Sequence, residues 1–129
     1  MINFNIDGVQ IDVELDNGYY EFIGLDYTGK SWLCRLLKSG NKQGLPVAGY
    51  DYKDFKAGVD MATVLNEKHK LIVLDRYTMY LGEGIELIKR IKDKAVIIAD
   101  VKSEKNYGIF GEMQLIEIEK NRIRLFSAY

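Results

Sequence analysis

The sequence has very little cysteine and proline, and its charges are balanced. One cysteine, Cys34, cannot form a disulfide within the chain, so a disulfide-stapled scaffold is excluded and a reducing cytoplasm is expected. Lys and Arg total 18 against 19 for Asp and Glu, so no basic excess indicates nucleic-acid binding. No apolar run approaches the roughly 20 residues that a bilayer-spanning helix needs, and the first residues lack a signal-peptide pattern. We therefore expect a cytoplasmic protein without a membrane span.

The sequence does contain enough apolar material for one hydrophobic core. Its 129 residues are 47% hydrophobic, a size and composition that suit a single compact domain. We find no internal repeat, linker or low-complexity tract. The prediction is one domain over residues 1–129.

The first part of the chain alternates between apolar and polar residues, with the period of a half-buried strand. Residues 2–6 and 11–15 follow this pattern, and Asp7-Gly8 between them is typical of a hairpin turn. A second turn at 16–18 leads into a short apolar run at 19–23. We predict two antiparallel strands followed by a buried strand.

Helical periodicity begins after this buried strand. We predict a helix from residue 30 that stops at Ser39-Gly40-Asn41, because glycine and asparagine are typical of helix ends. The segment 42–53 holds the only proline and two glycines, which favours mostly loop. A second helix is predicted over 54–68 and a third over 83–92.

Two continuous apolar runs, 71–74 and 95–99, end in Asp75 and Asp100 and are typical of strands buried on both faces. Alternation returns over 113–125, which predicts a closing hairpin. The order strand, helix, strand in the middle implies right-handed crossovers and parallel strands. We predict an α/β fold with a mainly parallel sheet flanked by helices, and with antiparallel hairpins at the N- and C-termini.

One segment carries a motif with a specific chemistry. Residues 24–31 satisfy G-x-x-x-x-G-K-[ST], a loop whose backbone N–H groups cradle phosphates. A helix that begins near Lys30 adds the positive end of its dipole. Lys30 is expected to reach the β- and γ-phosphates, and the Ser31 hydroxyl to bind Mg²⁺. The predicted ligands of a nucleoside triphosphate, ATP or GTP, are Gly24, Asp26, Tyr27, Thr28, Gly29, Lys30 and Ser31.

A phosphate loop of this kind needs an acid on a neighbouring strand to hold Mg²⁺ through water, and Asp75 has that position. Arg76 follows where many NTPases carry a glutamate base, and a guanidinium cannot accept a proton. Asp100 either senses the γ-phosphate or caps its strand. Glu83 and Glu86 are expected on a solvated helix face.

Other polar and aromatic residues receive simpler interpretations. Tyr19, Tyr20 and Tyr27 can stack on a nucleobase, and Tyr27 inside the loop is the one that we single out. His69 is expected in an exposed turn. Cys34 has no second cysteine and no base beside it, so we expect a buried structural thiol.

On these residues the chain resembles a P-loop NTPase, and residues 1–40 resemble the start of an ATP-binding-cassette (ABC-type) ATPase. In that family a hairpin runs into a strand, the phosphate loop and a Leu-rich helix. Residues 71–75 resemble its second nucleotide motif, 95–100 its following strand, and 113–126 its closing hairpin. The resemblance implies phosphate binding at Gly24, Gly29, Lys30 and Ser31, and Mg²⁺ binding at Asp75.

The chain departs from this family in its catalytic parts. The segment 41–79 leaves no room for the family's helical subdomain or its L-S-G-G-Q signature. Arg76 stands at the position of the catalytic glutamate, and Asp100 lies near that of the switch histidine. We therefore expect weak or absent hydrolysis. Two interpretations stay open: a protein partner supplies the missing catalytic groups, or the chain is a regulatory or interaction module that never turns over.

A second resemblance is to thymidylate and deoxynucleoside kinases, through the phosphate loop and Asp75-Arg76-Tyr77. In those enzymes such a D-R-Y motif binds the phosphate acceptor. They carry more chain between the two motifs and an Arg-rich lid, and this sequence has neither. A kinase-like phosphotransferase is therefore the alternative function.

Overall fold

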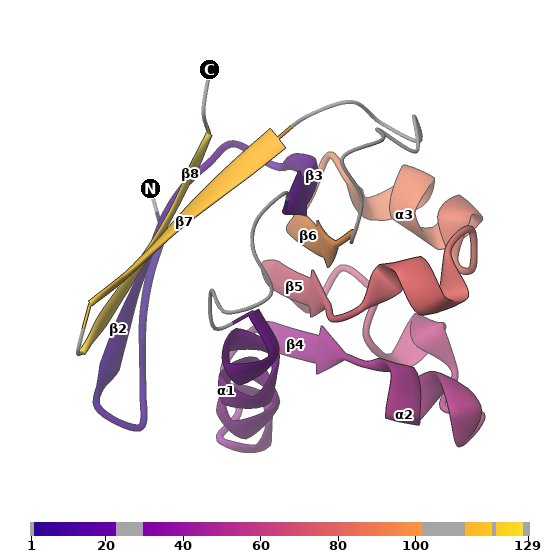
Figure 1. The fold of residues 1–129 in the computed structure, drawn as a ribbon, viewed down its shortest axis with the longest axis horizontal. Coiled ribbons are helices and arrows are strands. Elements are labelled where there is room, and N and C mark those ends of the chain that lie inside the picture. Colours follow the sequence, from indigo (N-terminus) through magenta and orange to yellow (C-terminus); the bar gives the residue numbers. More distant parts are fainter. Residues whose placement is uncertain (1, 23–29, 102–112, 120, 128–129) are drawn as a thin grey trace.

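The computed structural model describes residues 2–22, 30–101, 113–119 and 121–127 (Figure 1). Its strands and helices are β1 (Ile2–Ile6), β2 (Val9–Glu14), β3 (Gly18–Phe22), α1 (Lys30–Lys42), β4 (Val47–Tyr50), α2 (Tyr52–Lys56), η1 (Met61–Thr63), β5 (Leu71–Leu74), η2 (Tyr77–Tyr80), α3 (Ile85–Ile91), β6 (Val96–Asp100), β7 (Met113–Glu119) and β8 (Arg122–Ser127). None of the helices in these ranges is long and apolar enough to cross a membrane.

All these strands belong to one eight-stranded sheet in the order β1-β2-β8-β7-β3-β6-β5-β4. Strands β3, β6, β5 and β4 run parallel to one another. The hairpins β1–β2 and β7–β8 are antiparallel, and a parallel pairing of β2 with β8 joins them. The predicted α/β class is confirmed: parallel strands are flanked by helices, and the first and last strands of the chain form antiparallel hairpins.

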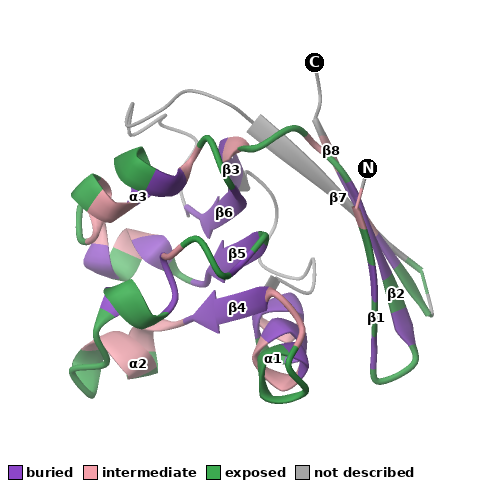
Figure 2. Ribbon diagram, turned by 180° about the vertical axis from the view of Figure 1, so that it is seen from behind, coloured by how far each residue is buried: buried purple, intermediate pink, exposed green. Residues whose placement is uncertain are grey.

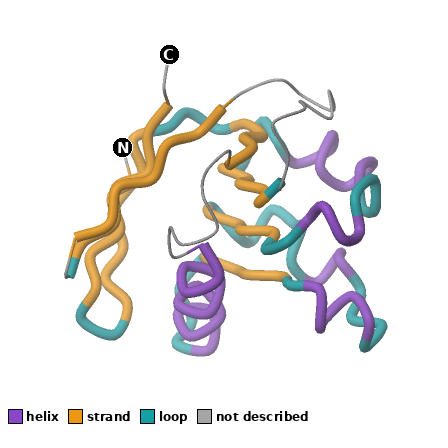
Figure 3. Tube along the Cα trace, viewed as in Figure 1, coloured by secondary structure: helices purple, strands orange, loops and turns teal. Residues whose placement is uncertain are grey.

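The sheet separates two hydrophobic cores, because successive side chains of a strand point to opposite faces. In β5, Leu71 and Val73 join the core under α1, whereas Ile72 and Leu74 join the core under η2 and α3. Figures 1 and 3 show α1 in the angle between the hairpins and the parallel strands, with the other helices on the far side. Figure 2 shows that β4, β5 and β6 are buried along their length.

Helix α1 continues past the predicted stop and ends at Lys42. Gly40 lies inside the helix, where a Cβ atom would come within 2.6 Å of Ile6 Cδ1 and 2.9 Å of Val47 Cγ2. The glycine is therefore needed for the close approach of α1 to β1 and β4, and it does not end the helix.

The prediction of mostly loop over 42–53 is wrong, because this segment contains the buried strand β4. Gly49 in β4 has the same role as Gly40: a Cβ there would lie 2.6 Å from the Cys34 carbonyl oxygen of α1. The predicted helix over 54–68 is also wrong. Helix α2 ends at Lys56, Gly58 takes a positive φ of +76°, and the Asp60 side chain caps η1 instead.

His69 is buried, which contradicts the prediction of an exposed turn residue. Its Nδ1 lies 2.8 Å from the Val64 carbonyl oxygen, and its Nε2 lies 3.1 Å from Asn41 Nδ2. Because a carbonyl only accepts and the Asn41 amide nitrogen only donates, Nδ1 donates to Val64 and Nε2 accepts from Asn41. His69 thus ties α1 to the segment before β5.

Candidate functional site

The candidate site forms where the parallel strands end, because their register brings polar residues to one level. Phe22 of β3 pairs with Asp100 of β6, and Leu74 of β5 pairs with Ala99. Asp75, the residue after Leu74, therefore lies level with Asp100 at the carboxyl edge of the sheet. In open α/β sheets this edge is where ligands bind.

The first turn of α1 brings the end of the phosphate motif to the same place. Leu33 and Leu37 pack into the core under α1, which fixes the helix on the sheet. The Ser31 hydroxyl then lies 3.2 Å from each carboxylate oxygen of Asp75. Ser31 and Asp75, the two Mg²⁺ ligands predicted from the sequence, are thus in direct contact although 44 residues separate them.

The other predicted phosphate ligands are less fully defined. Gly24, Asp26, Tyr27, Thr28 and Gly29 lie outside the described residues. Lys30 is the first residue of α1. The predicted helix start directly after the glycines of the motif is therefore correct.

Two ion pairs hold α1 in its position over the strand ends. Lys38 Nζ lies 2.8 Å from Asp51 Oδ2 and 2.6 Å from Asp54 Oδ2. Asp51 follows β4 directly and also forms a capping box with Asp54 at the start of α2. Asp51 was not predicted as a residue of the site, because the sequence favours mostly loop over 42–53. The signal was present, since Asp51, like Asp75 and Asp100, closes an apolar run.

The site concentrates negative charge in a poorly solvated place. Asp75 and Asp100 are only 6% and 8% exposed. Burial and then the Asp100 carboxylate raise the pKa of Asp75, while the Ser31 hydroxyl and the Arg76 charge act in the opposite direction. Two carboxylates that repel each other at one edge favour the binding of a cation.

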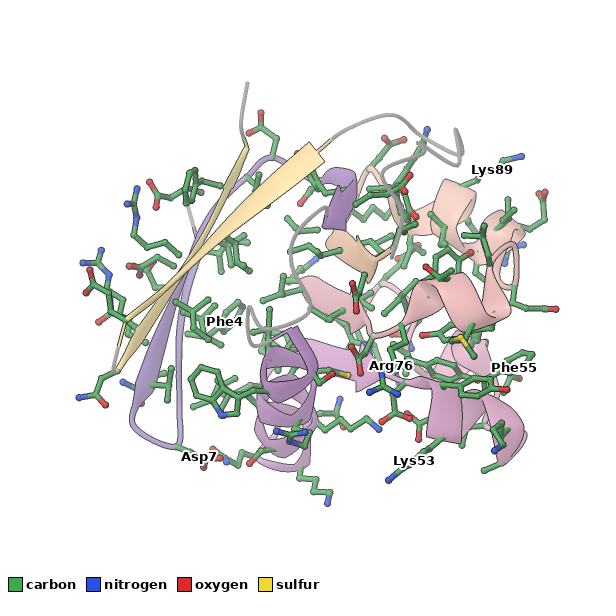
Figure 4. All side chains as sticks on the ribbon, in the orientation of Figure 1. Phe4, Asp7, Lys53, Phe55, Arg76 and Lys89 are labelled. Atoms are coloured by element: carbon green, nitrogen blue, oxygen red, sulfur yellow. The ribbon has the colours of Figure 1, made fainter. Side chains whose placement is uncertain are left out.

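Arg76 has an unusual backbone for a residue with a side chain. Its φ of 52° and ψ of 40° are left-handed, and its N–H donates to Asp100 Oδ2 at 3.4 Å. The residue is exposed. Figure 4 shows its side chain between α1 and α2, beside the ends of the central strands. A cation is therefore available at the rim of the site.

Ser31 and Asp75 are a donor pair that could hold Mg²⁺. Ser31 and Asp75 offer a hydroxyl and a carboxylate, the hard oxygen ligands that Mg²⁺ prefers. Within the part of the chain that the structure describes, no group of three or more His, Cys, Asp and Glu could hold a metal. Mg²⁺ typically takes one or two carboxylates and completes its shell with water and substrate phosphate.

The predictions for Tyr19, Tyr20 and Cys34 can be compared with the structure. Tyr19 and Tyr20 are only 4% and 6% exposed, so neither is free to stack on a base. Tyr27 lies outside the described residues. Cys34 is a buried free thiol as predicted, and burial raises its pKa to about 12.

Tyr80 is a residue at the site that no sequence signal indicated. The sequence predicts no element at Tyr80, yet its hydroxyl donates to the Asp75 carbonyl oxygen at 2.8 Å. Such a contact depends on tertiary packing alone.

Comparisons of the chain with protein-family models, with curated proteins and with solved structures gave no match. A functional assignment therefore depends on the motif and on the geometry at the carboxyl edge of the sheet.

Proposed function

We propose that this chain binds a Mg²⁺–nucleoside triphosphate, ATP or GTP, at the carboxyl edge of its parallel strands, with weak or absent hydrolysis. The observation that carries the proposal is the contact between the Ser31 hydroxyl and both Asp75 carboxylate oxygens at 3.2 Å. The phosphate motif predicts Ser31 as a Mg²⁺ ligand, and the need of such a motif for an acid on a neighbouring strand predicts Asp75. Their meeting in space supports both assignments.

Each group has a defined part in this proposal. The N–H groups at the start of α1 and the positive end of its dipole would attract the phosphates. Ser31 and, through water, Asp75 would hold Mg²⁺, and the ion would neutralise phosphate charge. Asp100, next to Asp75, either contacts a metal-bound water or senses the terminal phosphate.

Weak turnover follows from the residue after Asp75. A water molecule that attacks the terminal phosphate is normally oriented by an acceptor, and the Arg76 guanidinium has only donors. Its charge can instead stabilise bound phosphate. If the chain does hydrolyse nucleotide, a protein partner would have to bring the acceptor. A regulatory module that binds without turnover uses the same site.

The alternative function is transfer of the phosphoryl group to a nucleoside or nucleotide. The exposed Arg76 beside Asp75 favours it, because such a cation can bind an acceptor phosphate. Tyr77 argues against it. Its side chain is 0% exposed and its hydroxyl donates to the Glu83 carbonyl oxygen at 2.7 Å, so Tyr77 belongs to the core.

The test is a titration of fluorescent ATP and GTP analogues, with and without Mg²⁺, against the native chain and three variants. Lys30→Ala and Ser31→Ala alter the site. Ser39→Ala is the matched control, since Ser39 lies in the same helix but bonds to Asp7. Trp32, the only tryptophan, adjoins Ser31 and gives a second, label-free signal.

Saturable, Mg²⁺-dependent binding that Lys30→Ala abolishes, that Ser31→Ala weakens and that Ser39→Ala retains would support the proposal. Absence of binding to the native chain by either analogue would refute it. Addition of thymidine or its monophosphate then separates the kinase from the binding module, because only a kinase would form the phosphorylated acceptor.

A further inference from the structure

We propose that Tyr80 is a positioning residue for the Mg²⁺ ligand Asp75, an inference that rests on the proposed function. Tyr80 contacts neither metal nor nucleotide in this proposal. It acts through the backbone, by fixing the peptide bond between Asp75 and Arg76.

Both polar atoms of this peptide bond are held. The Asp75 carbonyl oxygen accepts from Tyr80 Oη at 2.8 Å, and the Arg76 N–H donates to Asp100 Oδ2 at 3.4 Å. Because the plane of the peptide is rigid, two such bonds set its rotation. The direction in which the Asp75 side chain leaves the backbone is set with it.

The same hydroxyl also connects two strand ends. Tyr80 Oη lies 3.2 Å from the Tyr50 carbonyl oxygen at the end of β4. That carbonyl accepts the Asp75 N–H at 2.8 Å, which continues the β4–β5 pairing by one residue. Tyr50, Asp75 and Tyr80 therefore form one hydrogen-bonded group directly beneath the site.

The Tyr80 ring is itself firmly placed, so its hydroxyl can serve as a fixed donor. The side chain is 3% exposed. Its ring stacks on Phe55 of α2 at 5.4 Å between centroids, and meets Tyr50 and Tyr77 edge-on at 5.6 and 5.2 Å (Figure 4 labels Phe55). These contacts limit its rotation before any ligand binds.

The left-handed conformation of Arg76 makes the hydrogen bond from Tyr80 to the Asp75 carbonyl oxygen important. A residue with a Cβ atom takes that conformation only when its surroundings impose it. If the hydroxyl is removed, the peptide can rotate toward a right-handed turn. Asp75 would then leave its position opposite Ser31.

Tyr77 provides a matched control in the same turn. It is also a buried tyrosine of η2 that donates to a backbone carbonyl, that of Glu83 at 2.7 Å. Tyr77→Phe and Tyr80→Phe each remove one such hydrogen bond. A purely structural role predicts similar effects for both, whereas a positioning role distinguishes them.

The experiment measures nucleotide-analogue affinity with and without Mg²⁺ for the native chain and both variants, at a temperature where thermal unfolding shows all three to be folded. We expect Tyr80→Phe to weaken binding about tenfold with Mg²⁺, the scale of one lost positioning bond, and to change Mg²⁺-free binding less than about twofold. Tyr77→Phe is expected to change both affinities less than about twofold. In an Asp75→Asn background, Tyr80→Phe should have no further effect on the Mg²⁺ dependence.

Equal behaviour of the two variants, or an equal loss with and without Mg²⁺, would overturn the positioning role and leave the proposed function standing. An additive effect in the Asp75→Asn background would overturn it too. Absence of Mg²⁺-dependent binding by the native chain would refute the proposed function itself, and with it the role of Tyr80.

Discussion

Replacement of Asp75 by asparagine should have opposite effects on the free and the liganded chain. The variant removes one of two neighbouring buried carboxylates but keeps an oxygen that can accept from Ser31. Burial and Asp100 raise the pKa of Asp75 in the folded chain, so its ionised form favours unfolding. Without Mg²⁺ at neutral pH, we expect Asp75→Asn to be more stable than the native chain by about 1 kcal/mol.

The pH dependence of this gain has a definite sign. Because the folded-state pKa of Asp75 lies above its unfolded value of about 3.8, this group stabilises the fold fully below that value. The stabilisation is lost as pH rises through the folded-state pKa. The advantage of Asp75→Asn should therefore grow from acid to neutral pH and then stay constant.

Ligand binding adds a larger effect of the opposite sign. At a ligand concentration of 100 times Kd, binding stabilises the native chain by about 2.7 kcal/mol. An unfolding entropy of about 2.1 cal/mol/K per residue gives about 0.27 kcal/mol/K for 129 residues. The native Tm should then rise by about 10 °C with Mg²⁺ and nucleotide. The 1 kcal/mol gain of the free variant corresponds to about 4 °C.

The assay is thermal unfolding of both chains with and without Mg²⁺–nucleotide. The native chain should be the less stable one alone and the more stable one with ligand, because the variant loses most of the ligand-induced rise. Glu83→Gln is the control, since it removes an exposed acid. It should change neither the Tm without ligand nor the rise in Tm with ligand. A variant that is less stable without ligand, or that keeps the full rise, would refute the reasoning.

Three further predictions concern other buried groups. Burial raises the pKa of Glu21, and its Oε1 has no hydrogen-bond partner among the described residues. Glu21→Met should therefore stabilise the chain by about 2 kcal/mol at pH 8 and by less toward pH 4, measured by urea unfolding. Gly49→Ala should destabilise the chain by about 2 kcal/mol and weaken Mg²⁺–nucleotide binding, because a Cβ 2.6 Å from the Cys34 carbonyl oxygen must displace α1. The control is Gly58→Ala, which has open space at its Cβ. It should cost about 1 kcal/mol of stability through its positive φ and leave the affinity unchanged. The Cys34 thiol, with its pKa near 12, should react with a thiol reagent at pH 8 only as fast as the chain opens, so an immediate reaction would contradict its burial.

The sequence predicted the elements whose periodicity agrees with their final environment. Strand β5 and residues 96–99 of β6 are apolar because both faces of the sheet are covered there, whereas buried residues of β1 and β8 alternate with more exposed ones. Strand β4 was missed because the proline and the two glycines of 42–53, Gly49 among them, indicated a loop. That glycine is there for the approach of α1, a tertiary requirement that local pattern does not show.

At the site, the residues that we propose as ligands were easier to predict than those that support them. Ser31 belongs to a motif, and Asp75 closes an apolar strand. Both signals are local in the sequence. The role of Tyr80 depends on a 3₁₀ turn whose ring packs on α2, so nothing near Tyr80 in the sequence indicates it.

The supports of the site also explain how binding could be communicated to the rest of the chain. Helix α1 carries Ser31 in its first turn, pairs with Asp51 and Asp54 through Lys38, and contacts Asp7 in the first hairpin through Ser39. A phosphate that pulls on the start of α1 therefore acts on a rigid helix with polar contacts on two sides. A shift of α1 would change the contacts of both α2 and the β1–β2 turn. If the chain is a regulatory module, these two surfaces are where a bound nucleotide should alter amide hydrogen exchange, whereas α3, which lies on the far face of the sheet, should be unaffected.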